Sequence, residues 1–347
     1  MKNLKDTLIY ALKRLLLMVF TFIVIFIICF VLIRLLPIPN TVGVGQDADI
    51  FGMRMVAMGR YYKTSSGEYR ALPIIVQLGN YVKNIFVTPR DLETGEALSK
   101  FGYSWFIAKN SSPDTLLFSR FTPTVILNVY TMIIAVPIGL LLGMFMALFK
   151  DKWIDNVLSV LIMILISVPS FVDALFFQWL FGYKLGVLPP MRYGLAEAGG
   201  WFTPKMTSSF ILPIISMSLG SICGYARYTR AELTEVLTSD FMLLARTKGL
   251  SRGQATVRHA FRNSLVPIFP MLLGEILSIL GGSMIIENIY GINGVGGLYL
   301  ESILKRDFDV FQFVAMFYII IGLLGGLIVD ISYGIVDPRI RMGGGKN

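Results

Sequence analysis

Residues 15–33, LLLMVFTFIVIFIICFVLI, contain no charged side chain and only one hydroxyl group, that of Thr21. A helix needs about 20 predominantly apolar residues to cross the hydrocarbon core of a bilayer. Lys13 and Arg14 precede the stretch and Arg34 follows it, which is the flanking pattern of a membrane helix. Because no small-residue cleavage site follows, we expect a retained transmembrane helix and not a removed signal peptide.

The composition of the 347-residue chain agrees, since it is 55% hydrophobic and only 15% charged. Soluble domains carry about 25% charged residues. Backbone groups in hydrocarbon must be hydrogen-bonded within their own segment, so each long apolar segment is predicted to be a helix. Pro137, Pro169 and Pro213 are expected to kink these helices. The sequence thus predicts an all-α membrane protein with five further spans, at 123–149, 157–181, 210–226, 265–286 and 310–336.

Lys and Arg residues predict the orientation, because they are enriched in cytoplasmic loops. With the N-terminus inside, the inner segments hold 16 Lys and Arg residues and the two short outer loops hold five. We therefore expect both termini in the cytoplasm of the cell whose membrane the chain spans. The predicted divisions are residues 1–36 (N-terminal segment and first span), 37–120 (an external region folded into strands or short helices) and 121–347 (the other five spans).

The sequence offers little covalent chemistry. Cys29 and Cys223 lie in apolar spans and are expected to be buried hydrophobic residues, and His259 has no Cys or His neighbour. We predict no catalytic residue, no metal site and no cofactor bound by this chain. The net charge of +9 is interpreted as a topology signal and not as a nucleic-acid surface.

The largest cytoplasmic segment, residues 227–262, has apolar residues at helical spacing. Gly249 is predicted to end a helix and Ser251 to cap the next one. Such an amphipathic helix could lie in the lipid interface, held by its basic residues. It could equally dock onto a cytoplasmic partner, and the spacing alone does not separate the two interpretations.

Further motifs along the chain decide between the lipid-interface and the docking interpretations. The loop contains Asp240-Phe241, then ARTKGL (245–250), RHA (258–260) and RNS (262–264), and Pro267 follows. SVPSF (167–171), GVLP (186–189), GGSMIIENIYGINGVGGL (281–298) and VDPRIR (336–341) lie around it. This set resembles permease subunits of ABC importers of the oligopeptide, dipeptide and nickel permease family, above all a B-type oligopeptide permease. Thr247 and Ser264 replace the usual alanines, and residues 35–100 match the family poorly.

The resemblance implies the type I ABC importer permease fold and a transport function without enzymatic activity. A second homologous permease, two cytoplasmic ATPase subunits that bind ATP and Mg²⁺, an extracytoplasmic peptide-binding protein and the lipid bilayer are the expected partners, and nucleic acid is not. The loop would be the EAA loop that fits a groove of the ATPase, with Ala245 on the face presented to that groove. The expected coupling residues are Glu235, Asp240, Phe241, Ala245, Arg246, Lys248, Gly249, Arg258, His259 and Asn263.

Polar residues within or next to the spans are candidates for the substrate path. An ionised carboxylate in a membrane is costly and usually faces the bundle interior or a water-filled path. Asp173 could face the amino group of a peptide or hydrogen-bond to the second permease. Glu287 is expected to anchor the glycine-rich loop, and Asp330 to serve in helix packing or capping. The candidate path residues are Asp173, Gln178, Glu275 and Glu287.

Three other functions compete with peptide import. Nickel or another small solute could use the same fold, although the predicted path lacks His and Cys. An intramembrane aspartyl enzyme would need Asp173 and Asp330 at one depth, and they lie on opposite sides of the bilayer centre. A secondary transporter would carry inverted repeats, and we find no internal repeat in the sequence.

The cation distribution makes the topology testable. Cysteines introduced at Ser112 and Ser208 should react with an impermeant maleimide added to intact cells, and one at Ser251 should react only after permeabilisation. External labelling of residue 251 would contradict the orientation and the docking interpretation together.

Overall fold

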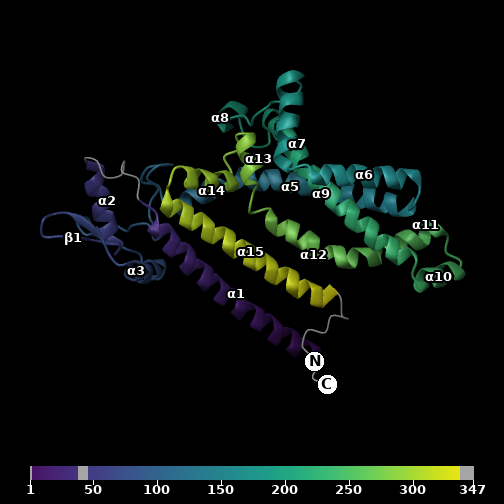
Figure 1. Cartoon of the computed structure of the whole chain (residues 1–347), viewed down its shortest axis with the longest axis horizontal. Coiled ribbons are helices and arrows are strands. Elements are labelled where there is room, and N and C mark those ends of the chain that lie inside the picture. Colours follow the sequence, from purple (N-terminus) through teal and green to yellow (C-terminus); the bar gives the residue numbers. More distant parts are fainter. Residues whose placement is uncertain (1, 38–45, 337–347) are drawn as a thin grey trace. The chain divides into compact units, whose positions relative to one another are not determined.

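The computed structural model describes residues 2–37 and 46–336 (Figure 1). Its contacts divide the chain into two compact units that do not follow sequence order. The first unit comprises Met1–Leu15, Pro123–Gly294 and Leu324–Asn347, and the second comprises Leu16–Thr122 and Val295–Leu323. The predicted division at residues 36 and 120 follows membrane topology and stays a prediction.

The all-α class is confirmed, and an apolar helix or helix pair overlaps each predicted span. Among the described residues, five helical segments are long and apolar enough to cross a membrane, namely Ala11–Leu35, Pro113–Leu148, Pro204–Leu237, Gly253–Ser278 and Phe308–Ser332. Trp153–Ser167 and Ser170–Lys184 qualify together as a sixth span, with a bend of 94° between them.

The first unit contains most of the helices. They are α5 (Phe121–Leu148), α6 (Trp153–Ser167), α7 (Ser170–Phe177) with the π-helix Gln178–Lys184, α8 (Leu195–Ala198), α9 (Pro204–Leu237), α10 (Asp240–Thr247), α11 (Arg252–Ala255) with the π-helix Thr256–Phe261, α12 (Arg262–Ser278) and α13 (Met284–Ile289). The N-terminal end of α1 and the C-terminal end of α15 belong to this unit as well. Within it, α9 contacts α6, α7, α12 and α13, so it is the central helix.

Two glycines let α5 approach α9 closely. A Cβ added at Gly139 would lie 2.6 Å from the Cβ of Tyr225, and one at Gly143 would lie 2.6 Å from the Cβ of Thr229. The two glycines are four residues apart and therefore lie on one face of α5. This is the small-xxx-small pattern by which membrane helices bring their backbones together.

Two predicted spans differ from the structure. The third predicted span, residues 157–181, is broken and not merely kinked, because Val168 before Pro169 is extended (ψ 126°) and α7 begins only at Ser170. A proline disfavours the helical conformation of the residue before it. The fifth, residues 265–286, ends at Ser278 in α12, and Gly282 then has φ +66°. Pro137 and Pro213 lie within α5 and α9 without interrupting either helix.

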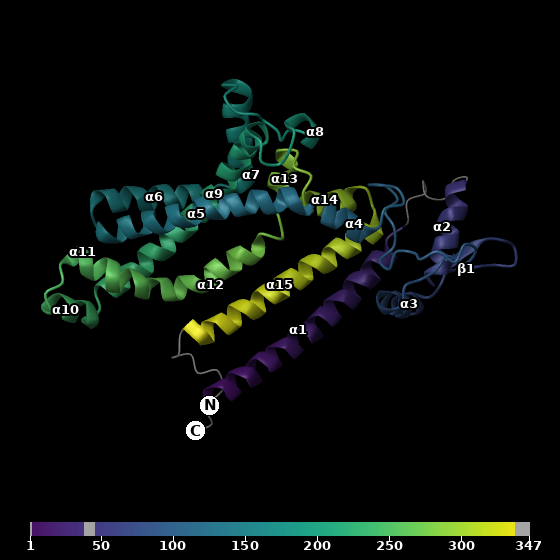
Figure 2. The same cartoon turned by 180° about the vertical axis from the view of Figure 1, so that it is seen from behind.

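The second unit contains the external region and the helices that contact it. Its elements are α1 (Lys2–Leu35), α2 (Gln46–Ala57), β1 (Tyr61–Lys63), β2 (Tyr69–Ala71), α3 (Ile74–Phe86), α4 (Pro113–Ser119), α14 (Val295–Leu304) and the outer part of α15 (Phe308–Val336). The two strands form an antiparallel hairpin in which Tyr62 is paired with Arg70. Figures 1 and 2 show α1 and α15 running beside each other.

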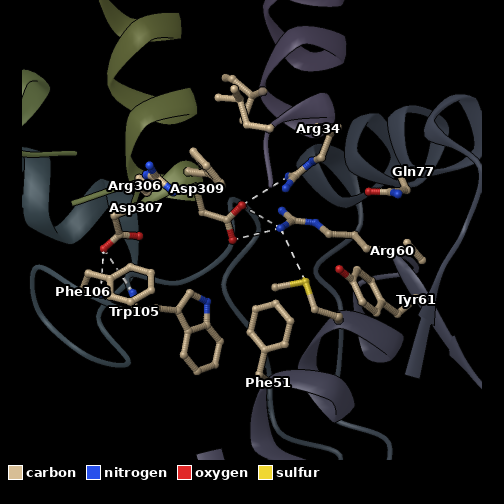
Figure 3. A pocket seen from close by; sticks show the side chains of 15 residues that line it. Arg34, Phe51, Arg60, Tyr61, Gln77, Trp105, Phe106, Arg306, Asp307 and Asp309 are labelled. Atoms are coloured by element: carbon tan, nitrogen blue, oxygen red, sulfur yellow. Dashed lines mark hydrogen bonds and ion pairs between the residues drawn. The ribbon is translucent and has the colours of Figure 1, made fainter. Parts of the chain in front are cut away.

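A buried ion cluster joins the external region to α1 and α15 (Figure 3). The Asp309 carboxylate accepts hydrogen bonds from Arg60 Nη1 at 2.7 and 2.9 Å, from Arg34 Nη2 at 3.3 Å and from the backbone N–H of Tyr103 at 3.3 Å. The Arg60 and Asp309 side chains are 2% and 4% exposed. Removing one partner of a buried ion pair leaves an uncompensated charge, so the pair fixes the position of the external region.

A second carboxylate orders the loop next to this cluster. Asp307 Oδ2 accepts from the Ser104 hydroxyl at 2.6 Å and from three successive backbone N–H groups, of residues 105–107, at 3.0–3.1 Å. Burial raises the pKa of Asp307, although these hydrogen bonds act in the opposite direction. Asp307 and Asp309 line a cavity of about 90 Å³ together with Arg34, Arg60, Phe51 and Trp105 (Figure 3).

We expect Asp309→Asn to lower the free energy of unfolding by about 3 kcal/mol, because Arg60 and Arg34 lose their counterion in a buried site. The matched control is Glu301→Gln, whose partners Arg120 and Lys305 lie 2.8 and 2.7 Å away with all three side chains partly exposed, and it should cost about 1 kcal/mol or less. Denaturant titration of both purified variants in detergent measures the difference. Equal losses would mean that the Asp309 cluster does not anchor the external region.

Candidate functional site: the cytoplasmic coupling segment and the broken span

The coupling segment begins where α9 ends. The Thr238 hydroxyl donates to the Glu235 carbonyl at 2.9 Å and the Ser239 hydroxyl donates to the Val236 carbonyl at 2.5 Å. The backbone N–H groups of Thr238 and Ser239 bond to the same two carbonyls at 3.2 and 3.1 Å, which closes the last turn of α9 on these residues. The amphipathic pattern read as one helix is therefore divided between α9 and α10, because these two hydroxyl residues end the first helix.

The end of α10 is confirmed as predicted. Gly249 has φ +92°, a left-handed conformation that glycine adopts without steric cost. The N–H of Leu250 reaches back to the carbonyl of Ala245 at 3.4 Å, which is the long hydrogen bond of a Schellman motif. Ser251 and Gln254 then form a capping box, with bonds of 3.2 and 3.3 Å. The basic arm that follows thus has a defined direction relative to α10.

One face of α10 is buried within the chain itself. Met242 and Ala245 are 4% and 8% exposed. The prediction that Ala245 lies on the face presented to a partner is wrong, because this side chain packs inside the first unit. A charged residue at this position would disrupt the internal packing before any docking. The cluster contains Ala147, Leu233, Met242, Ala245, Ala255 and Ala260.

The apolar side chains of α10 outside this cluster are exposed. Phe241, Leu243 and Leu244 are 41%, 64% and 54% exposed, and we call these three residues the coupling face. Asp240 and Lys248 lie at the ends of this helix and are exposed. Of the other predicted coupling residues, Glu235, Arg258, His259 and Asn263 are exposed, and the side chain of Arg246 lies outside the described part of the structure.

An ion pair that sequence reasoning missed holds the base of this segment. Arg230 Nε and Nη2 donate to the two carboxylate oxygens of Asp155 at 2.6 and 2.7 Å, which joins α9 to α6. Asp155 is fully buried and also accepts from the backbone N–H of Asp151 at 3.0 Å. Such a two-pronged pair fixes orientation as well as distance. The partners are 75 residues apart in the chain, and no motif joins them.

The candidate path residues lie in α7, in the π-helix that follows it, in α12 and in α13. Asp173 is in the first turn of α7, directly after the 94° break, where the helix N-terminus favours a negative charge. Glu275 on α12 accepts a hydrogen bond from Ser221 of α9 at 3.3 Å. Both are partly exposed, and their assignment to a substrate path stays a prediction.

Gln178 bridges the broken span to the glycine-rich loop. Its side-chain amide donates to the carbonyls of Pro190 and Ile289, each at 2.8 Å. Tyr290, next to Ile289, lies 2.8 Å from the Ser216 hydroxyl and donates to the Ala174 carbonyl at 2.9 Å. Burial raises the pKa of the Tyr290 hydroxyl to about 12, although the bond with Ser216 lowers it, so the hydroxyl keeps its proton at neutral pH.

Glu287 lies in a closely fitting cradle and not in an open channel. It is fully buried, and the Thr124 hydroxyl donates to its Oε1 at 2.8 Å. A Cβ at Gly294 would lie 2.5 Å from its carboxyl carbon, and one at Gly282 would also collide with the carboxylate. The carboxylate therefore organises the loop, as the sequence suggested, and Gln178 and Glu287 both act on the α13 segment.

Within residues 2–37 and 46–336, no three His, Cys, Asp or Glu side chains gather in a way that could hold a metal ion.

Residues 139–342 match the family of binding-protein-dependent transport system inner membrane components. The chain belongs to this family. The matched part of this inner membrane component includes the break at Pro169, the coupling segment and the Glu287 loop, whereas α1 and the external region precede it. Its relatives are transport subunits, so the component is a transport protein and not an enzyme.

Two curated relatives extend the likeness over nearly the whole component. The dipeptide transport system permease protein DppB of Bacillus subtilis (strain 168) is 30% identical over 334 residues, 96% of this chain and 98% of that protein. The glutathione transport system permease protein GsiC of Salmonella typhi is 29% identical over 333 residues, again 96% and 98%. A chain of the MetNI methionine ABC transporter in an inward-facing conformation shares the fold, with a TM-score of 0.50, 16% identity and coverage of 65% of this chain and 99% of that one.

Proposed function

We propose that this component is one of two permease subunits of an ATP-driven importer of peptides. An extracytoplasmic binding protein delivers the peptide, and a pair of cytoplasmic ATPase subunits binds at the coupling face. The observation that carries the proposal is the three-residue apolar face of α10, exposed at the end of the central helix α9. The names of the relatives, which concern dipeptides and glutathione, favour peptides over the nickel alternative.

The coupling face fits a protein groove better than the lipid interface. Its apolar side chains lie between Asp240 and Lys248, and the internal cluster with Met242 and Ala245 holds α10 rigidly from behind. The well-packed, desolvated centre of a protein interface supplies most of its binding energy. A helix supported in this way transmits force, because it cannot move without moving α9.

The contacts of α9 could transmit movement from its cytoplasmic end to the helices near the substrate path. Its 34 residues extend for about 50 Å at the rise of an α-helix. Arg230 ties its inner part to α6 through Asp155, and Ser216 joins it through Tyr290 to the broken span and the glycine-rich loop. ATPase closure would therefore rotate α6, α7 and α13 with α9 as one body, which is a known form of switching between two states.

Peptide-stimulated ATP hydrolysis by the reconstituted complex tests the function. The importer with its binding protein should hydrolyse ATP faster when a dipeptide or tripeptide is present, and Ni²⁺ should have no such effect. Stimulation by Ni²⁺ alone would overturn the peptide assignment, and the absence of any associated ATPase would overturn the importer assignment.

Leu244→Asp should lower recovery of the ATPase on the purified permease pair by on the order of tenfold or more, since a central apolar contact costs about 2 kcal/mol or more. Leu185→Asp is the matched control, because Leu185 is 55% exposed and Leu244 is 54% exposed and residue 185 lies in the predicted outer loop. Unchanged recovery with Leu244→Asp would contradict docking and favour the interpretation that α10 lies in the lipid interface.

Asp173→Asn should lower uptake of cationic peptides more than uptake of neutral ones, because it removes a partly exposed carboxylate beside the break. Competitive uptake of Lys-containing and Ala-containing dipeptides into proteoliposomes measures the ratio. An equal loss for both, or loss of the assembled complex, would instead indicate a structural bond with the second permease.

A further inference from the structure

Helix α3 of the second unit has its polar side chains on the inside. Gln77, Asn80 and Asn84 lie on one face, and Gln77 and Asn84 are buried, at 5% and 8% exposure. Each donates its side-chain amide to a backbone carbonyl of the preceding segment, namely Leu72 at 2.7 Å, Gly59 at 2.5 Å and Met58 at 3.0 Å. These bonds fasten α3 to the end of α2 and to the hairpin.

A second face of α3 lies against two membrane helices. Tyr81 is 1% exposed, and its ring is 5.9 Å from that of Phe26 and 5.5 Å from that of Phe30, both on α1. Its hydroxyl donates to the sulfur of Met316 on α15 at 3.6 Å. In Figures 1 and 2, α3 is seen almost end-on beside α1, which runs across the picture, so the two helices cross steeply.

The remaining face of α3 is apolar and uncovered. Ile75, Val76, Val82 and Phe86 are 73%, 42%, 39% and 80% exposed, and Lys83 lies at the edge of this face. A helix in water shows the opposite arrangement, with its apolar stripe toward the core and its polar residues toward solvent. The environment of this face must therefore differ from water.

The contacts of Tyr81 place α3 at the depth of the membrane. Phe30 and Phe26 precede Arg34 by four and eight residues, which corresponds to about 6 and 12 Å of helix. Met316 follows Asp309 by seven residues, or about 10 Å. Arg14 and Arg34 are 20 residues apart, about 30 Å of helix, which equals the thickness of the hydrocarbon core.

We propose that α3 lies in the outer leaflet of the bilayer, parallel to its surface, with Ile75, Val82 and Phe86 against the lipid acyl chains. Interfacial helices have their apolar faces buried to about 5–10 Å, which is the depth that Tyr81 indicates. On α1, Ile23 and Ile27, which are near Phe26 and Phe30 along the helix, are also exposed. Lys83 can extend its ammonium group back to the headgroups. Part of residues 37–120 is thus embedded in the membrane. This placement does not rest on which substrate is transported.

Spin labels on the full-length chain in proteoliposomes test this placement. In a background of Cys29→Ala and Cys223→Ala, labels at Val82→Cys and Phe86→Cys should collide more often with oxygen than with a water-soluble nickel chelate. Ile27→Cys on α1 is the lipid-facing control. Ser66→Cys, on the turn between β1 and β2, is the water-facing control and should show the reverse order.

Two results would overturn the proposal. Labels at 82 and 86 that meet the nickel chelate as often as the label at 66 would place the face in water. Labels that neither reagent reaches, while the label at 27 meets oxygen, would mean that a protein partner covers it.

A pair of variants at Gly79 gives a second measurement, since an added Cβ at this position would meet open space. In lipid nanodiscs, Gly79→Asp should lower the midpoint of thermal unfolding, and Gly79→Leu should leave it unchanged or raise it. Equal shifts for the two variants would contradict a lipid contact.

Discussion

The hydrogen-bonding requirement of backbone groups inside the hydrocarbon determines where this fold can depart from regular helix. Side-chain amides supply hydrogen bonds to backbone carbonyls near the interrupted spans. Asn128 of α5 donates to the Ile279 carbonyl just beyond α12, and Gln178 donates to the carbonyls of Pro190 and of Ile289, the last residue of α13. The irregular segments of the first unit therefore depend on amide and hydroxyl side chains of neighbouring helices, which lie close enough to hydrogen-bond to their backbone carbonyls.

The central position of α9 joins the two functional regions. Small residues allow α5 to approach it, an ion pair fixes it to α6, and the Ser216–Tyr290 contact connects it to the loop that follows α12. Packed interiors switch between discrete arrangements and do not deform continuously, so a helix held at both ends transmits displacement. In the proposed mechanism the buried contacts of Met242 and Ala245 would serve the same purpose, because a compliant support of α10 would absorb the motion.

Much of the candidate site could be predicted because its signals are local. The Gly249 stop and the Ser251 cap involve partners within six residues, and the expectation that Glu287 anchors its loop rests on glycines a few positions away. The error over Ala245 has a physical cause. Helical spacing separates an apolar face from a polar one, but α10 has apolar residues on both sides, and only its contacts with α9 and α11 decide which of them is buried.

The sequence by itself determined the membrane class, the approximate spans and the two helix signals around Gly249, since apolar length and capping depend on neighbouring residues. Its motifs also determined the resemblance to a transport family. The tertiary structure alone decided which charges neutralise each other and which polar faces turn inward. Arg60 and Asp309 are 249 residues apart, Gln178 and Ile289 are 111 apart, and the amides of α3 bond to carbonyls 5 to 26 residues away. Such contacts have no periodicity in sequence, because each forms only after separate helices have packed together.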